Sequence, residues 1–402
     1  MTTDLRTRHD ADIAETSLDA FFDVTFPALV QRNAQHLHPW LGTRELPDLT
    51  FQCGDRHWRL SQRNGSVVAA PGAATTGPCV KLDDEEFSGL VNDLYTPMTF
   101  LVGGTLNMER GGIGELLDWW LVLRALIDGR TIGIAAPLDF PGLDGQPLDL
   151  QHGFHPDDAI EQMRHFLQTA GFLHIKGLFS EQEMTAISAD IDANQHKYQE
   201  GDNKSWWATT KSGERRLVRL QAFDQLSQPT AALLQDPRFL RLGDITGDGH
   251  RHSGLVGNAI EALIKPLDVV KGISDLPWHK DCSLGRHSYE CCSLTVGVSV
   301  TGAGPDSGQL RVIAGSHRVL MWPSLISDAD AQGLPIIDLP TQTGDVTLHL
   351  SCTHHMAQAP TARERRVLYT SFRLPHAADA AGKAARERIS RSREAAYKNV
   401  SQ

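Results

Sequence analysis

The stretch GDVTLHLSCTHHMAQAPTARERRVLYTSF, residues 344–372, contains two β-like runs separated by a polar segment with two adjacent histidines. Gly344 and Asp345 form a turn signal ahead of the first run. Upstream, from about residue 215, further short β-rich runs are separated by Gly, Pro and Asp: RRLVRLQAF, AIEALIKPLDVV, SLTVGVSVTG and GQLRVIAG. Many short strands at close spacing predict a sandwich or jelly roll for this part of the chain.

The segment LPWHKDCS, residues 276–283, carries an imidazole and a carboxylate two positions apart. On a β-strand, residues i and i+2 point to the same face, so His279 and Asp281 would be directed at one spot. Two imidazoles and one carboxylate on one face of an octahedral metal form the facial triad of non-heme iron oxygenases. The pair would therefore supply two of the three ligands of such a site.

The downstream histidines supply the third ligand, and the residues themselves leave His349, His354 and His355 as candidates. Three positions on the metal then remain for a bidentate oxoacid and dioxygen. Arg366 opens the second β-like run and would bind the far carboxylate of the oxoacid, because a planar guanidinium binds a carboxylate bidentately. Strand alternation directs the neighbouring Arg365 to the opposite face, where we expect it to be solvated.

Four motifs carry a family resemblance: W-H-K-D at 278–281, S-G-Q-L-R-V-I-A-G-S-H-R at 307–318, G-D-x9-H-x10-R from Gly344 to Arg366, and GFLHIKGLFSEQEM at 171–184. Through these motifs, residues 156–375 resemble the phytanoyl-CoA dioxygenase family of 2-oxoglutarate oxygenases. The resemblance implies a double-stranded β-helix (a jelly-roll or cupin-like fold) with flanking helices and the metal near its mouth. It also implies Fe(II) as the cofactor, with 2-oxoglutarate and O2 as co-substrates.

Carried over residue by residue, the resemblance implies that His279, Asp281 and His355 are the iron ligands. It also implies that Arg366 binds the C5 carboxylate of 2-oxoglutarate. We therefore expect these four residues to be catalytic.

The chain departs from the family at Ala357, where the family usually has Ser or Thr two residues after the distal histidine. That hydroxyl helps the arginine to hold the carboxylate. Tyr369, Thr370 or Ser371 would supply it here instead, and Thr370 is the candidate for a second cofactor-binding residue.

Residues 15–135 have a different pattern. Asn64-Gly65, the strongest short hairpin signal, lies between the two β-like runs of RHWRLSQRNGSVVAA. A strand and an acidic helix start (DDEEF) follow, and the apolar segment GIGELLDWWLVLRALIDG forms a buried closing helix that ends at Gly129. This pattern predicts a small α+β domain, and the order of its pieces resembles the sterol carrier protein-like, lipid-binding fold.

The complete chain is thus predicted to be mixed α+β. Residues 1–14 would form a polar tail, residues 136–155, rich in Pro, Gly and Asp, a linker, and residues 376–402 a charged, helical tail. Within the oxygenase-like part, Ser180 and Glu183 form a capping box that opens a helix.

Composition excludes several classes of function. The net charge of -11 argues against general binding to nucleic acid or to a membrane surface, because phosphate-rich partners select basic proteins. The first residues lack an apolar signal region, and no apolar run is long enough to span a membrane. None of the six cysteines forms a CxxC pair, and we interpret them as reduced thiols of a cytoplasmic protein.

We expect the protein to hydroxylate an unactivated C–H bond of an apolar or carrier-bound small molecule, such as an acyl chain or a natural-product scaffold, with release of succinate and CO2. The presence of Asp281 favours hydroxylation, since related halogenating sites lack this carboxylate. Two alternatives are a non-catalytic lipid-binding or scaffold protein with a degenerate oxygenase domain, and a metal-dependent hydrolase that uses zinc or manganese. An oligomer is compatible with the sequence.

Overall fold

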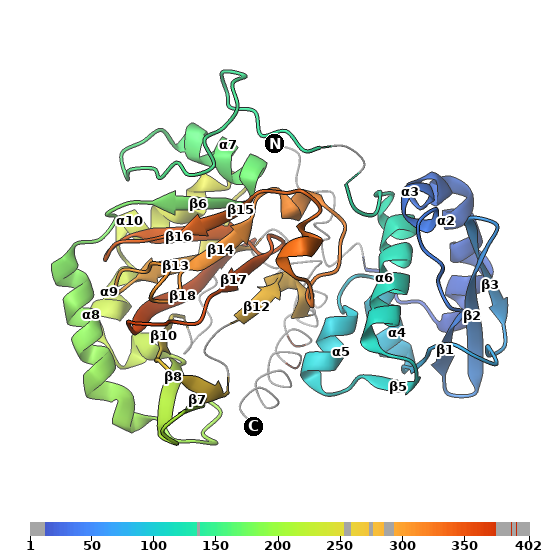
Figure 1. Ribbon diagram of the computed structural model, residues 1–402, viewed down its shortest axis with the longest axis horizontal. Coiled ribbons are helices and arrows are strands. Elements are labelled where there is room, and N and C mark those ends of the chain that lie inside the picture. The colour runs from blue at the N-terminus through green and yellow to red at the C-terminus, as the bar shows by residue number, and fades with distance from the viewer. Residues whose placement is uncertain are drawn as a thin grey trace.

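The computed structural model describes residues 13–134, 137–252, 259–272, 276–284 and 293–374, together with Glu387 and Arg391. Its elements form two groups that lie side by side in Figure 1. The expected tails at residues 1–14 and 376–402 lie almost entirely outside the described residues. None of the described helices is long and apolar enough to cross a membrane.

The N-terminal group is a small α+β unit built on a five-stranded sheet in the order β3-β2-β1-β4-β5. Strands β1 and β4 are parallel, and the other neighbours are antiparallel. The hairpin predicted at Asn64-Gly65 is confirmed, because both residues have positive φ and join β2 to β3. The elements are α1 (Leu18–Ala20), the π-helix η2 (Phe21–Thr25), α2 (Phe26–Asn33), η3 (Ala34–His36), α3 (His38–Leu41), β1 (Leu49–Cys53), β2 (Arg56–Arg63), β3 (Ser66–Pro71), β4 (Cys79–Lys81), α4 (Asp84–Val91), α5 (Pro97–Gly103), β5 (Asn107–Arg110) and α6 (Ile113–Asp128).

Helix α6 is buried on most of its circumference, as the sequence predicts, and ends at Gly129 in the left-handed conformation. Between α6 and α7 no described residue belongs to a helix or strand.

The C-terminal group contains two antiparallel sheets. The larger has the order β11-β7-β8-β10-β18-β13-β16-β6, with β9 paired to β18, and the smaller has the order β12-β17-β14-β15. The mixed α+β class predicted from the sequence is confirmed. The helices and strands are α7 (Ile160–Ala170), β6 (Phe172–Ile175), α8 (Glu181–Asn194), β7 (Ser205–Thr210), β8 (Arg215–Leu220), α9 (Gln228–Leu233), α10 (Pro237–Leu240), β9 (Arg251–His252), β10 (Glu261–Lys265), β11 (Val269–Lys271), β12 (Leu276–His279), β13 (Leu294–Ser299), β14 (Leu310–Ile313), β15 (Ile336–Leu339), β16 (Val346–Leu350), β17 (His355–Ala357) and β18 (Arg365–Arg373). Short 3-10 turns are η4 (Gln195–Lys197), η5 (Phe223–Gln225), η6 (Arg241–Ile245), η7 (Asp281–Leu284), η8 (Ser316–Arg318) and η9 (Asp328–Ala331).

Helices α8 and α10 cover one face of the larger sheet (Figure 1). Phe372 of β18 packs against Phe239 of α10, with ring centroids 5.3 Å apart. Because side chains alternate along a strand, the even-numbered residues 366–372 face these helices and the odd-numbered residues 365–371 face the other way. This assignment decides which side chains of β18 can reach the site.

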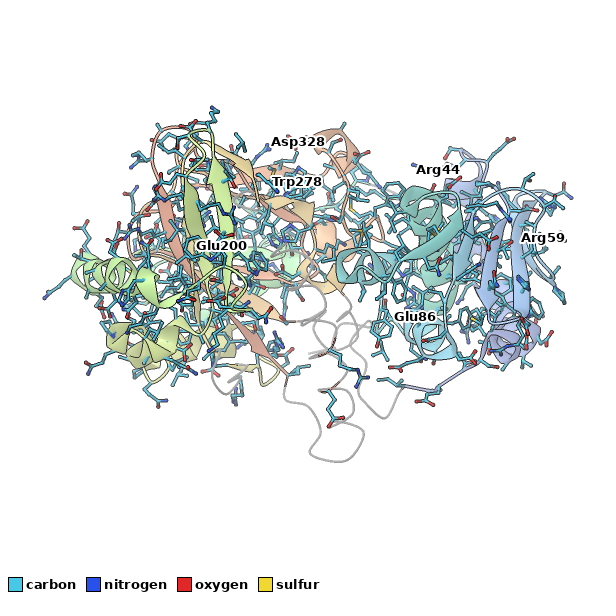
Figure 2. All side chains as sticks on the ribbon, turned by 90° about the horizontal axis from the view of Figure 1, so that it is seen from below. Arg44, Arg59, Glu86, Glu200, Trp278 and Asp328 are labelled. Carbon is cyan, nitrogen blue, oxygen red and sulfur yellow. The ribbon has the colours of Figure 1, made fainter. Side chains whose placement is uncertain are left out.

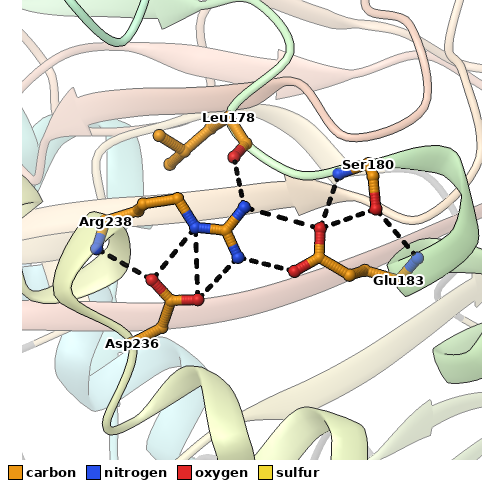
Figure 3. Close-up of polar contacts among 5 residues, drawn as sticks. All are labelled: Leu178, Ser180, Glu183, Asp236 and Arg238. Carbon is orange, nitrogen blue, oxygen red and sulfur yellow. Dashed lines mark hydrogen bonds and ion pairs between the residues drawn. The ribbon is translucent and has the colours of Figure 1, made fainter.

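Arg238 holds α8 and α10 together (Figure 3). It bridges Glu183 of α8 at 2.5 Å and Asp236, the N-cap of α10, at 2.6 Å, and it donates to the carbonyl oxygen of Leu178 at 3.2 Å. The capping box predicted for Ser180 and Glu183 is confirmed. Hydrogen bonding from Arg238 lowers the pKa of Glu183 to about 2, although burial opposes the shift.

Residues of the C-terminal group pack into the hydrophobic core of the N-terminal group. Leu320 belongs to the N-terminal core cluster and pairs with Ile132 in a parallel bridge. Two residues further on, the indole Nε1 of Trp322 donates to Asp118 of α6 at 2.9 Å. Helix α5 also contacts η7. The N-terminal unit therefore packs directly against the turn that carries Asp281.

Candidate metal centre

The structure brings three predicted side chains together. His279, Asp281 and His355 each offer a ligand atom, and these atoms all lie within 4.8 Å of one another. Oδ1 of Asp281 lies 3.6 Å from Nε2 of His279 and 3.5 Å from Nε2 of His355. The two histidines face each other across the β12–β17 pair, where His279 is the register partner of His355.

The reason for the convergence of His279 and Asp281 differs from the one that the sequence suggested. Strand β12 ends at His279, and Asp281 opens the 3-10 turn η7. The two side chains meet because the chain turns after the strand, and the alternation within one strand is not involved. Trp278 fixes the end of β12, since it is buried and its Nε1 donates to Asp328 at 2.7 Å (Figure 2).

Backbone carbonyls select the tautomers of the two histidines. Nδ1 of His279 lies 2.8 Å from the carbonyl oxygen of Pro277, and Nδ1 of His355 lies 3.0 Å from that of Thr353. A carbonyl oxygen only accepts hydrogen bonds, so each Nδ1 carries the proton and each Nε2 directs a lone pair toward Asp281. Metal-binding histidines are held in the same way by partners at the second ring nitrogen.

Asp281 is ionised in this environment. Burial raises its pKa, but the neighbouring imidazoles of His355, His279 and His349 outweigh burial and lower the pKa well below its ordinary value. A carboxylate and two imidazole nitrogens with free lone pairs match the donor set that Fe(II) takes in non-heme oxygenases. The residues present therefore fit an iron ion.

The other two histidine candidates lie near the triad but outside it. Nε2 of His349 lies 3.3 Å from the second carboxylate oxygen of Asp281, and its ring lies against that of His355, tilted by 42° with centroids 4.0 Å apart. His354 is fully buried, and burial lowers the pKa of its imidazole well below the ordinary value. His355, and not His349 or His354, joins His279 and Asp281 because it lies at the start of β17, opposite His279.

Arg366 does not lie with the triad. It sits on the helix-covered face of β18, where its two terminal nitrogens bind Asp192 of α8 at 2.9 and 2.7 Å and its Nε binds Glu364 at 3.1 Å. Thr370 shares this face and bonds to His252 and to the carbonyl oxygen of Ala259, both at 2.7 Å. The expected spacing from the distal histidine is kept, but the register of β18 turns both side chains away from the site.

Arg365 occupies the opposite face, and the prediction that it is solvated is wrong, since it is only 3% exposed. It donates to the carbonyl oxygen of Gly308 at 2.8 Å and to the Tyr369 hydroxyl at 3.4 Å, while its Nε has no hydrogen-bond partner among the described residues. Tyr369 lies beside Gly297, where an added Cβ would come within 2.9 Å of the ring.

This face of β18 is the face of the triad. Two residues before Gly297 on β13, the hydroxyl of Thr295 donates to Asp281 at 2.7 Å. Thr295 and Gly297 point the same way, because they are two positions apart on one strand. Asp281, Thr295, Tyr369 and Arg365 therefore lie on one side of the sheet.

Sequence reasoning also missed Lys265. It is the register partner of Arg365, so both cations point to the same side. Lys265 is 4% exposed, and its ammonium donates to the carbonyl oxygens of Gln358 at 3.0 Å and Ala357 at 3.4 Å, three and two residues after His355. Arg365 and Arg366 are adjacent, so one of the two points to each face of the strand. The residues themselves did not indicate which arginine faces the triad.

The expectation that the cysteines are reduced thiols is wrong for Cys352, which is disulfide-bonded. Cys53, Cys79 and Cys282 are free thiols. Spacing along the chain did not reveal this, because the fold decides which thiols meet.

A model of the family Phytanoyl-CoA dioxygenase (PhyH) matches residues 167–367, which is half of the chain. No curated protein matches the chain. Among solved structures, the chain is similar to the non-heme α-ketoglutarate-dependent epimerase SnoN from nogalamycin biosynthesis (18% identity, 53% of this chain and 81% of that chain, TM-score 0.40). It is also similar to the carbocyclase SnoK from the same biosynthesis (18%, 55% and 87%, 0.41) and to EctD from S. alaskensis with 2-oxoglutarate and 5-hydroxyectoine (16%, 60% and 82%, 0.45).

Proposed function

This chain belongs to the phytanoyl-CoA dioxygenase family, and from that premise we propose that it hydroxylates an unactivated C–H bond of a small molecule while 2-oxoglutarate is converted to succinate and CO2. It is a 2-oxoglutarate-dependent non-heme iron enzyme that uses Fe(II), 2-oxoglutarate and O2. The observation that carries the proposal is the convergence of His279, Asp281 and His355 within 4.8 Å.

His279 and His355 would bind the metal through Nε2, and Asp281 through Oδ1. Iron bound there supplies the activation of dioxygen. The residues supply the coordination geometry, and the carbonyls behind each Nδ1 keep both imidazoles in the tautomer that can bind. Three ligands on one face leave room for a bidentate oxoacid and for dioxygen.

Arg365, and not Arg366, would bind the C5 carboxylate of 2-oxoglutarate. Two observations support this role: Arg365 is buried on the triad's side of β18, and Arg366 is engaged with Asp192 on the other side. Tyr369 would supply the hydroxyl that the family has at the position of Ala357, since it already contacts Arg365. Lys265 would add a second positive charge beside a dianionic co-substrate.

We also propose that the two antiparallel sheets form the double-stranded β-helix of this enzyme class, over residues 156–375. The N-terminal unit, residues 15–135, would have the sterol carrier protein-like fold, joined by a linker at 136–155. A lipid-carrier-like neighbour favours an apolar or carrier-bound substrate.

Anaerobic titration of the Fe(II)-loaded protein with 2-oxoglutarate tests the proposal. We expect a weak visible charge-transfer band, followed by succinate formation when oxygen is admitted. Asp281→Ala should abolish both, whereas Arg366→Met, which alters the other face of the sheet, should preserve both. A metal-dependent hydrolase or a scaffold protein would give neither band nor succinate.

A further inference from the structure

Asp281 has two carboxylate oxygens, and they lie in different environments. Oδ1 faces Nε2 of His279 and of His355, at 3.6 and 3.5 Å. Oδ2 faces two other side chains: the hydroxyl of Thr295 at 2.7 Å and Nε2 of His349 at 3.3 Å. One oxygen is thus turned to the candidate iron ligands and the other to the large sheet.

Thr295 and His349 form a row across that sheet. They are register partners on the antiparallel strands β13 and β16, so their side chains stand next to each other on the same face. His349 is 1% exposed, and its ring also lies against the ring of His355. The row therefore contacts two of the three predicted iron ligands from the sheet side.

We propose that Thr295 and His349 are positioning residues that hold Oδ2 by hydrogen bonds and so restrict Asp281 to binding the metal through Oδ1 alone. This inference rests on the proposed function, since it concerns the same metal site. Neither the family match nor the triad itself assigns a role to either residue.

The number of coordination positions on the metal shows why binding through Oδ1 alone matters. An octahedral metal has six positions, of which the three protein ligands take three when the carboxylate is monodentate. The oxoacid takes two more and dioxygen takes the last. A bidentate carboxylate would take that last position, so 2-oxoglutarate could still bind but oxygen could not reach the metal.

The tautomer of His349 agrees with this role. For its Nε2 to donate to Oδ2, the proton must reside on Nε2, which leaves Nδ1 without one. Nδ1 of His349 is buried and has no hydrogen-bond partner among the described residues. The other tautomer would leave a buried N–H without an acceptor at Nδ1 and would turn the lone pair of Nε2 toward the carboxylate, so it would satisfy neither ring nitrogen.

His349 does not itself complete the cluster. The group of ligand atoms within 4.8 Å of one another includes His279, Asp281 and His355 but not His349. A fourth protein ligand would also occupy a position that the co-substrates need. The geometry therefore assigns His349 to the support of Asp281 and not to the metal.

The test counts the water molecules on Mn(II), bound in place of Fe(II), by water-proton relaxation. The wild-type protein should hold three waters without 2-oxoglutarate and one with it. In the double variant Thr295→Val/His349→Leu the carboxylate becomes free to bind with both oxygens, and the counts should fall to two and zero. The inner-sphere relaxation enhancement should then drop by about one third before 2-oxoglutarate is added.

Two controls separate positioning from packing. Thr295→Ser keeps the hydroxyl and should retain three waters, and Thr347→Val alters the same face of β16 one row away and should also retain three. Thermal unfolding checks that each variant is folded. If the double variant does not fold, Thr295→Val replaces it in the test, because it conserves the shape of the side chain and should show a partial loss of bound water.

Unchanged water counts in both the double variant and Thr295→Val would overturn the proposal, as would an equal loss in Thr295→Ser. If the wild-type protein binds neither Mn(II) nor 2-oxoglutarate, the proposed function fails as well. Failure of the positioning proposal and failure of the proposed function are distinguishable, because the wild-type protein still binds Mn(II) and 2-oxoglutarate when only the positioning proposal fails.

Discussion

Replacing Arg365 by methionine should weaken 2-oxoglutarate binding, whereas replacing Arg366 should not, because the two side chains lie on opposite faces of β18. Arg365→Met removes a buried guanidinium on the triad's side. Hydrogen bonds to a charged group contribute about 1.5–3 kcal/mol, so the Kd for 2-oxoglutarate should rise roughly 10- to 150-fold. Arg366→Met removes an ion pair with Asp192, which is 59% exposed, and should cost about 0.2–1 kcal/mol of stability. Its Kd for 2-oxoglutarate should stay within about twofold of wild type.

The assay is an anaerobic titration of the Fe(II)-loaded variants with 2-oxoglutarate, followed through the visible charge-transfer band. Fe(II) affinity is measured in parallel and should be unchanged in both variants. Arg365→Lys serves as a second variant at the buried position, since it keeps the charge and loses the fork; its affinity should fall between wild type and Arg365→Met. Weakened binding in Arg366→Met together with normal binding in Arg365→Met would refute the assignment.

Three further predictions follow from contacts elsewhere in the chain. Arg238→Met should lower the free energy of unfolding by about 1 kcal/mol at pH 7, and denaturant titrations should show the difference shrinking as pH falls from about 4.3, the ordinary pKa of Glu, through about 2. The sign follows because the depressed pKa of Glu183 adds stability only where the unfolded chain would already be ionised; a difference that grows at low pH would contradict it. Trp322→Phe leaves the half-buried Asp118 without its indole donor and should lower the free energy of unfolding by about 1–3 kcal/mol. Arg44→Met is the control, since its guanidinium lies 3.5 Å from the same carboxylate but is 51% exposed, and it should lower the free energy of unfolding by about 0.5 kcal/mol or less. Gly297→Ala would place a methyl group 2.9 Å from the Tyr369 ring and should destabilise the fold by about 1–3 kcal/mol while weakening 2-oxoglutarate binding; an unaltered affinity would separate Tyr369 from the co-substrate.

Local signals predicted much of the fold. The Asn64-Gly65 hairpin, the Ser180 cap and the Gly129 helix end depend on residues close together in sequence, and all three are present. The sequence also predicted that His279, Asp281 and His355 lie together, although His279 and Asp281 converge through a turn after β12.

The side-chain direction at the start of β18 was not predictable. Strand periodicity is two, so a displacement of one residue exchanges the faces of Arg365 and Arg366, and both faces of this strand are covered. The partners that decide the register, Asp192 on α8 and Gly308 before β14, are far away in sequence. For the same reason no motif indicated Lys265 or Thr295, and the sequence indicated His349 only as a candidate metal ligand. The roles proposed for the three residues depend on contacts between segments that are far apart in sequence.

The central claim is that His279, Asp281 and His355 bind one iron ion. Crystals loaded anaerobically with Fe(II), with diffraction recorded on both sides of the iron absorption edge, test it most directly. A single anomalous peak bonded to Nε2 of both histidines and to Oδ1 of Asp281 is the predicted result. No peak at this position, or a peak coordinated by other side chains, would contradict the account.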